Sequence, residues 1–152
     1  MRVAAAQLPA QDDSDDKLFT TANAVIMLDG ASAFIPVQVP ASSYADHLGH
    51  QLQQRLTDLP DAPLPEVLAN AIHATARALD LTPGESPSST VAIARARGSL
   101  VDLLVLGDTQ IVTPDGTIHD DRTDRLEFAP RRKYRERLTA GAGHDDEHRA
   151  LL

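Results

Sequence analysis

The pattern of apolar and polar residues near the start of the chain predicts a pair of strands. The stretch "KLFTT" (17–21) is followed by "NAVIML" (23–28), and short apolar, β-branched runs of this kind are typical of a β-hairpin. Because the second run is continuous, we expect that strand to be buried on both faces. The earlier stretch "RVAAAQL" (2–8) is compatible with a further short strand.

Two amphipathic helices are expected next. Tyr44, Leu48, Leu52 and Leu56 recur every four residues and form one apolar stripe. Ser43 and Asp46 have capping-box spacing, so we expect this helix to begin at Ser43. After the break "LPDAPLP", apolar residues again follow helical spacing as far as "TPGESPS" and predict a second helix that packs antiparallel to the first: Leu64, Val67, Leu68, Ala71, Ile72 and Leu79.

The remaining pattern predicts a meander of strands. "STVAIARAR" and "LVDLLVLGD" lie on either side of Gly98-Ser99, which is a tight-turn signal, and "TQIVT" and "GTIHDD" lie on either side of Pro114-Asp115-Gly116. We interpret Asp115-Gly116 as part of a turn. The order of strands, helix pair and meander predicts an α+β fold with an antiparallel sheet packed on helices. The charged tail after residue 130 is expected to form two helical pieces.

Composition narrows the class of protein. The chain has 152 residues, enough for one domain, and carries a formal net charge of -8, which disfavours a nucleic-acid partner. It contains no cysteine, and it lacks both a signal-peptide pattern and an apolar run of roughly 18 residues. We therefore expect a cytoplasmic protein that does not associate with membranes.

Acidic residues lie where strands are expected to begin and end. Asp12, Asp13, Asp15 and Asp16 precede the first hairpin, Asp29-Gly30 closes its second strand, and Asp108 closes the strand "LVLGD". Hard divalent cations prefer such oxygen ligands. The alternative is structural, because acidic runs often form solvated loops and Asp-Gly often forms turns.

This series of motifs resembles the protein phosphatase 2C family, the metal-dependent serine/threonine phosphatases of the PPM type, in the form found in actinobacteria. The family's Asn-Glu-Asp motif is matched by "SDDKLF", its Asp-Gly strand end by Asp29-Gly30, its Gly-Ser-Thr strand opening by "SSTVAIAR", and its Gly-Asp-Ser by "LGDT". The resemblance covers roughly residues 3 to 126. It implies an α-β-β-α sandwich of antiparallel sheets between helix pairs. Residues 1–152 would form a single domain whose C-terminal part, with further metal ligands, is missing.

The resemblance also implies a site and an activity. Asp29 would bridge two Mn²⁺ or Mg²⁺ ions, and Gly30 would offer a backbone carbonyl. Asp16, with Asp15 in place of the family's glutamate, would hold the second ion or its water. In the full-length form, these ions would support the hydrolysis of phosphoserine or phosphothreonine in a phosphoprotein.

Departures from the family pattern leave a second interpretation open. Gln11 occupies the position of the family's phosphate-binding arginine, and Ser14 replaces the motif's asparagine. We expect this chain to be weakly active or inactive, and the alternative is a non-catalytic, phosphatase-like module that binds or regulates a protein partner.

Half of a sandwich would also expose an apolar sheet face, so a homo-oligomer is expected. His144 and His148 have the spacing of a helical zinc pair, but we favour a helix start with acidic residues near its N-terminus and His148 in solvent.

Overall fold

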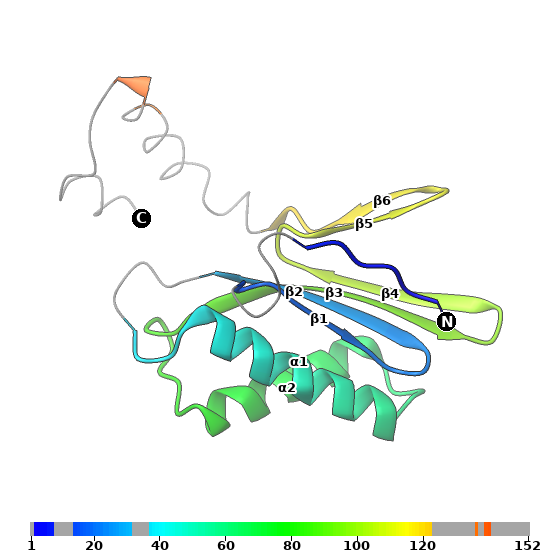
Figure 1. Ribbon diagram of the computed structural model, residues 1–152, viewed down its shortest axis with the longest axis horizontal. Helices are drawn as coiled ribbons and strands as arrows, with labels where there is room; N and C mark the ends of the chain where they lie inside the picture. Colours follow the sequence, from blue (N-terminus) through cyan, green and yellow to red (C-terminus); the bar gives the residue numbers. More distant parts are fainter. Residues whose placement is uncertain (1, 8–13, 32–36, 123–135, 137–138, 141–152) are drawn as a thin grey trace.

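The computed structural model describes residues 2–7, 14–31, 37–122, 136 and 139–140. These residues form an α+β fold with antiparallel sheets and two helices, which confirms the predicted class (Figure 1). In chain order, the elements are β1 (Lys17–Thr20), β2 (Ala24–Ala31), α1 (Ala41–Asp58), α2 (Leu64–Ala78), β3 (Ser88–Arg97), β4 (Leu100–Leu106), β5 (Gln110–Thr113) and β6 (Gly116–His119).

The first four strands form one antiparallel sheet in the order β1-β2-β3-β4. The β3–β4 hairpin turns at Gly98-Ser99 as predicted, with Gly98 at a φ of 61°, a left-handed conformation that glycine adopts without strain. A separate hairpin of β5 and β6 turns at Pro114-Asp115, which confirms the turn interpretation of that motif. Figure 1 shows the helices on one side of the four-stranded sheet and the β5–β6 hairpin on the other.

Burial in β2 alternates along the strand, so the prediction of burial on both faces is wrong. Ala24, Ile26 and Leu28 are fully buried against the helices, whereas Met27 is 42% exposed. The reason is that successive side chains of a strand point to opposite faces, and the helix pair covers only one of them. Residues 2–7 lie outside any strand, which corrects the expectation of a strand there.

Both helices occur where the apolar stripes predicted them. The stripe of α1 is buried, and α2 buries Leu64, Val67, Leu68 and Ala71. Helix α1 begins at Ala41 rather than Ser43, because the Pro40 carbonyl already accepts a hydrogen bond from the Tyr44 N–H at 3.1 Å. No side chain caps this end.

Helix α1 approaches β1 closely through a glycine. A Cβ on Gly49 would lie 1.9 Å from the ring of Phe19, whose side chain fills the space beside the helix. Phe19 also meets His50 edge to face, with ring centroids 5.0 Å apart. The packing of β1 on α1 therefore depends on a residue without a side chain at position 49.

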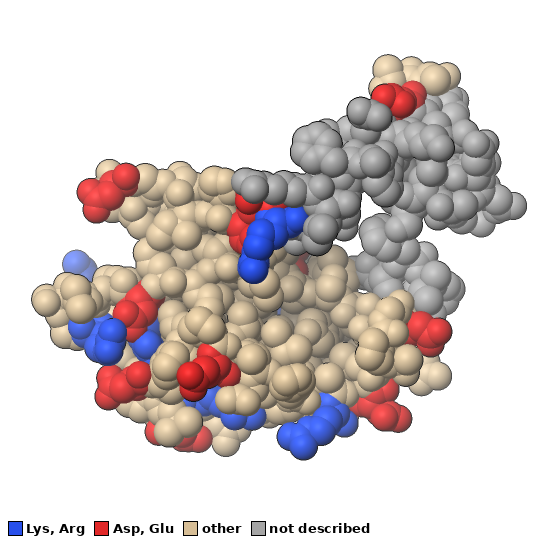
Figure 2. Space-filling view, turned by 180° about the vertical axis from the view of Figure 1, so that it is seen from behind, with Lys and Arg blue, Asp and Glu red and all other residues tan. Residues whose placement is uncertain are grey.

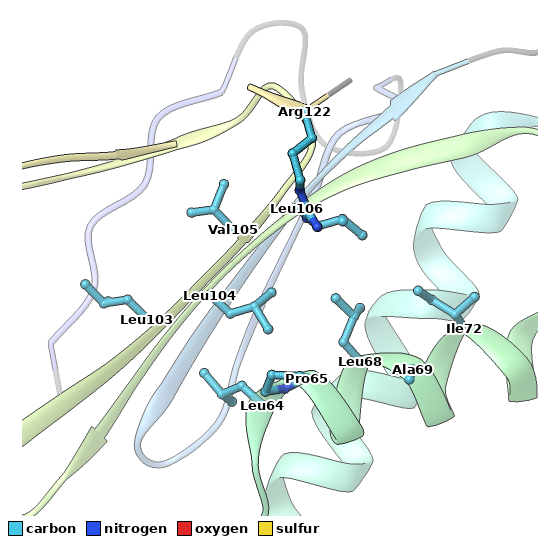
Figure 3. A pocket seen from close by; sticks show the side chains of 10 residues that line it. All are labelled: Leu64, Pro65, Leu68, Ala69, Ile72, Leu103, Leu104, Val105, Leu106 and Arg122. Carbon is cyan, nitrogen blue, oxygen red and sulfur yellow. The ribbon is translucent and has the colours of Figure 1, made fainter. Parts of the chain in front are cut away.

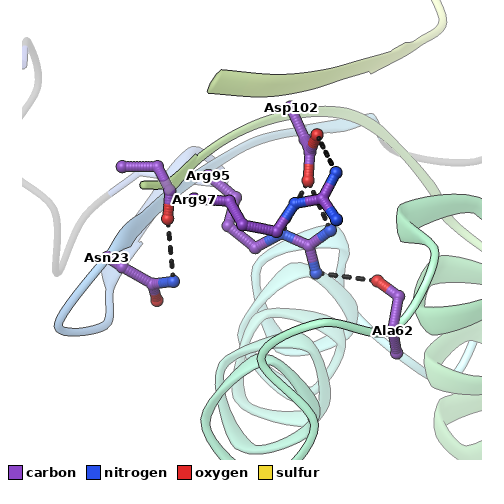
Figure 4. A network of polar contacts seen from close by, with 6 residues as sticks. Asn23, Ala62, Arg95, Arg97 and Asp102 are labelled. Carbon is purple, nitrogen blue, oxygen red and sulfur yellow. Dashed lines mark hydrogen bonds and ion pairs between the residues drawn. The ribbon is translucent and has the colours of Figure 1, made fainter. Parts of the chain in front are cut away.

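A buried arginine links the sheet to the helix pair (Figure 4). Arg95 in β3 is 2% exposed and donates to the Asp102 carboxylate of β4 at 2.6 Å and to the carbonyl of Ala62, between the helices, at 2.7 Å. Arg97 binds the other oxygen of Asp102 at 3.2 Å. The arginines hold the pKa of Asp102 below its ordinary value, chiefly through the hydrogen bond from Arg95.

The predicted helices of the charged tail lie almost entirely outside the described residues. Within the part of the chain that the structure describes, no helix is both long and apolar enough to span a bilayer.

Candidate functional site

The strand register brings the predicted acidic residues together at one end of the sheet. Lys17 pairs with Leu28, so the next residue outward, Asp16, is level with Asp29. On its other side, Asp29 pairs with Thr90 of β3, and Gly30 pairs with Ser89. Asp16, Asp29 and Thr90 thus form a row across the sheet.

Gly30 allows the chain segment before β1 to lie directly on β2. A Cβ at position 30 would lie 2.7 Å from the carbonyl oxygen of Asp15 and 3.1 Å from its Cβ. Any larger residue would displace the Asp15 backbone, because the first of these distances is shorter than real contacts allow. The structure therefore explains why glycine follows Asp29, and it places Asp15 beside Gly30.

Asp29 lies in an environment that disfavours its negative charge. Partial burial of the carboxyl group is the largest cause of its raised pKa. The neighbouring Asp16 side chain, within hydrogen-bonding reach, raises the pKa further. The charges of Asp108 and Asp15 act in the same direction. Three other acidic residues that the sequence places near strand ends, Asp16, Asp108 and Asp15, are thus close enough to influence the carboxyl group of Asp29.

Ser14, which the sequence marked only as a replacement of the motif's asparagine, and Gln7, which it did not mark, hold the Asp16 segment in place. Ser14 is buried, and its Oγ accepts a hydrogen bond from the Asp16 N–H at 3.0 Å. Gln7 Nε2 donates to the Asp16 carbonyl at 2.9 Å. The Ser14 contact has a sequence signal, since a serine two residues before an aspartate commonly closes such a turn; the Gln7 contact has none.

The β4 end of the site is held by a salt bridge. Gly107 has a φ of 85°, and its N–H donates to Asp120 Oδ2 at 3.3 Å. Arg122 binds the same carboxylate at 2.7 Å and shifts the pKa of Asp120 far below its ordinary value. These contacts fix the turn from which Asp108 extends.

Nearby, the buried Thr90 Oγ1 has no hydrogen-bond partner among the described residues.

The described residues supply part of a cation shell rather than a complete one. Asp16 and Asp29 are adjacent, but no group of three or more His, Asp or Glu side chains in the described ranges is arranged to hold a metal ion. Gln11, Asp12, Asp13, His144 and His148 lie outside the described residues. The assignment of Asp15, Asp16, Asp29 and Gly30 as metal ligands therefore stays a prediction.

Comparisons with known proteins give a limited result. No family model matches the chain, and no curated protein matches it in sequence. A similar solved structure is that of the Mycobacterium tuberculosis serine/threonine phosphatase PstP/Ppp, with 15% sequence identity and a TM-score of 0.47. The match covers 89% of this chain and 56% of that chain, so the chain spans little more than half of that protein's length. Similarity at this level leaves the function to be inferred from the chain's own residues.

Proposed function

We propose that this chain is a phosphatase-2C-like module that binds a divalent cation at the strand-end carboxylates. In a form with the remaining ligands, it would hydrolyse phosphoserine or phosphothreonine in phosphoproteins. The observation that carries the proposal is the position of Asp29, which lies level with Asp16 near the end of β2 and has its pKa raised by partial burial and then by Asp16, Asp108 and Asp15. A cation would relieve the mutual repulsion of these carboxylates.

Each proposed ligand has a distinct part. The carboxylates of Asp29 and Asp16 would contact the cation directly, Gly30 would offer its carbonyl, and Asp15 would bind the ion or one of its waters. Mn²⁺ and Mg²⁺ suit this set, since all of these donors are oxygens. A divalent ion lowers the pKa of a bound water, which is the chemistry that it would supply for phosphate ester hydrolysis.

The incomplete ligand set predicts weak binding and little activity for this chain alone. Two adjacent carboxylates and one carbonyl leave half of an octahedral shell to water. Without a complete pair of ions and without the family's arginine, the transition-state charge would have little stabilisation.

The same observation favours a second candidate, a non-catalytic module that keeps the phosphatase-like fold and binds a protein partner. In that case, the carboxylate cluster would serve to place the segment before β1. The two candidates differ in one property, which is metal-dependent hydrolysis that requires Asp29.

A phosphate-release assay separates them. With a phosphothreonine peptide and Mn²⁺, we expect slow phosphate release that Asp29→Asn abolishes and Asp115→Asn preserves. Asp115 is a matched control because it also precedes a glycine but lies in the β5–β6 turn. No release from any variant supports the non-catalytic module, whereas release that Asp29→Asn leaves unchanged would remove Asp29 from the site.

A further inference from the structure

Strand β1 lies at one edge of the four-stranded sheet, and alternate residues along it face away from β2. Thr21, directly after β1, donates its N–H to the carbonyl of Ala24 in β2 at 2.9 Å. Because neighbouring residues of an antiparallel strand bond to opposite sides, the main-chain groups of Asp16 and Thr20 face the open edge. Asp16 therefore lies outside the ladder of hydrogen bonds that joins β1 to β2.

Two side chains hold the main chain of Asp16 instead. Ser14 Oγ accepts a hydrogen bond from its N–H at 3.0 Å, and Gln7 Nε2 donates to its carbonyl at 2.9 Å. The Ser14 bond stays within one turn, whereas the Gln7 bond ties Asp16 to the separate segment 2–7. Figures 1 and 3 both show this segment between the four-stranded sheet and the β5–β6 hairpin. The main chain of residues 2–7 forms no hydrogen bond with other described residues, so Gln7 provides its polar link to β1.

A second glutamine makes the same kind of contact at the far end of β1. Gln53 Nε2, from α1, donates to the carbonyl of Thr20 at 2.8 Å. An amide side chain thus holds a carbonyl at each end of the strand. The two contacts have the same chemistry, but only that of Gln7 adjoins the acidic residues, so the chain contains its own control.

We propose that Gln7 is a positioning residue of the cation site, because its hydrogen bond keeps the carboxylate of Asp16 beside that of Asp29. This inference rests on the proposed function of these carboxylates. Residues level with each other outside the ladder bonds have Cα atoms only about 4.5 Å apart, so a small shift of the Asp16 main chain would separate the two carboxylates. Gln7 would act through Asp16 and would not contact the ion.

A Mn²⁺ titration, followed by paramagnetic broadening of NMR signals, tests the proposal with a matched pair of variants. Gln7→Met and Gln53→Met each replace the amide with an unbranched side chain of similar length that cannot donate. Gln7→Met should raise the dissociation constant for Mn²⁺ at least about tenfold, as losing a hydrogen-bond partner of a metal ligand does, and Gln53→Met should leave it unchanged. On the face shown in Figure 2, acidic and basic side chains alternate without a large area of one sign on the described residues, so loose Mn²⁺ binding there should add little.

The outcomes separate the role of Gln7 from the cation site itself. No Mn²⁺ binding by the unmodified chain would overturn both the site and a positioning role at it. Binding that Asp29→Asn abolishes but Gln7→Met leaves unchanged would overturn only the role of Gln7. Equal weakening by Gln7→Met and Gln53→Met would do the same, because it would reflect a general loosening of β1.

A pair of thiols measures the same positioning without metal. The chain has no cysteine, so Asp16→Cys combined with Asp29→Cys places two thiols where a disulfide can form. In a glutathione redox buffer, the disulfide equilibrium gives the effective concentration of one thiol at the other. We expect Gln7→Met to lower this effective concentration severalfold and Gln53→Met to leave it unchanged. An effective concentration that Gln7→Met does not lower would contradict the proposal, and Gln7 would then only fasten residues 2–7.

Discussion

At the scale of single residues, the carboxyl group of Asp29 is the most informative feature. The sequence correctly placed Asp29 near the end of a strand and near other acidic residues, although β2 continues through Asp29 and Gly30 to Ala31 because both residues stay paired with β3. The sequence did not show that Asp16 would be level with it, since register follows from the pairing of Lys17 with Leu28. Nor did it show that Gly30 would lie against the Asp15 backbone.

The raised pKa of Asp29 predicts a pH-dependent effect of Asp29→Asn on stability without metal. At a pH below the ordinary pKa of 3.8, Asp29 is protonated in both the folded and the unfolded chain and does not lower the free energy of unfolding. As the pH rises through the raised pKa of the folded state, ionised Asp29 destabilises the fold. We expect Asp29→Asn to be more stable at pH 7 by about 0.5 kcal/mol, because solvent screens these carboxylates.

Urea unfolding at several pH values measures this difference. The advantage of Asp29→Asn should disappear near pH 3, and Asp115→Asn should show no comparable change. An advantage that does not vary with pH would mean that the asparagine acts through packing rather than through charge.

At the scale of elements, the spacing of apolar residues and the residue types that favour turns predicted most of the helices, strands and turns. The four-residue stripe of α1 and the Gly98-Ser99 turn are local properties, and both are confirmed. The start of α1 was missed because Pro40 caps the helix through its backbone carbonyl, which the capping-box pattern does not represent. The exposure of Met27 was missed because a continuous apolar run does not show which of its faces a helix will cover.

Arg95 shows how a buried polar contact joins elements, and its position in the sequence is only an indirect signal of this contact. It follows Val91 and Ile93 at alternate positions that face the helices. We expect Arg95→Met to lower the free energy of unfolding by about 2 kcal/mol, because Ala62 and Asp102 lose a buried partner.

Arg97→Met is the matched control, since Arg97 binds the same carboxylate but is 49% exposed. Its effect should be within about 0.5 kcal/mol. Chemical denaturation of both variants compares them. Equal losses of unfolding free energy in the two variants would show that the burial of Arg95 does not strengthen its contact with Asp102.

At the scale of the whole molecule, the described residues form a helix pair, a four-stranded sheet and a two-stranded hairpin. The α+β class and the antiparallel sheet on helices are confirmed. The full four-layer sandwich, the single domain of 1–152 and the complete metal centre remain predictions. They depend on contacts between distant segments, which periodicity along one chain does not specify.

The most direct test of the proposed cation site is the melting temperature with and without Mn²⁺. If the chain binds Mn²⁺ with a dissociation constant near 1 mM, about 10 mM Mn²⁺ should stabilise it by about 1.4 kcal/mol. For a domain of this size, the melting temperature would rise by roughly 3 to 6 °C. The same rise should occur in Asp115→Asn and be absent in Asp29→Asn. An unchanged melting temperature of the unmodified chain, or an equal rise in Asp29→Asn, would contradict a cation site at these carboxylates.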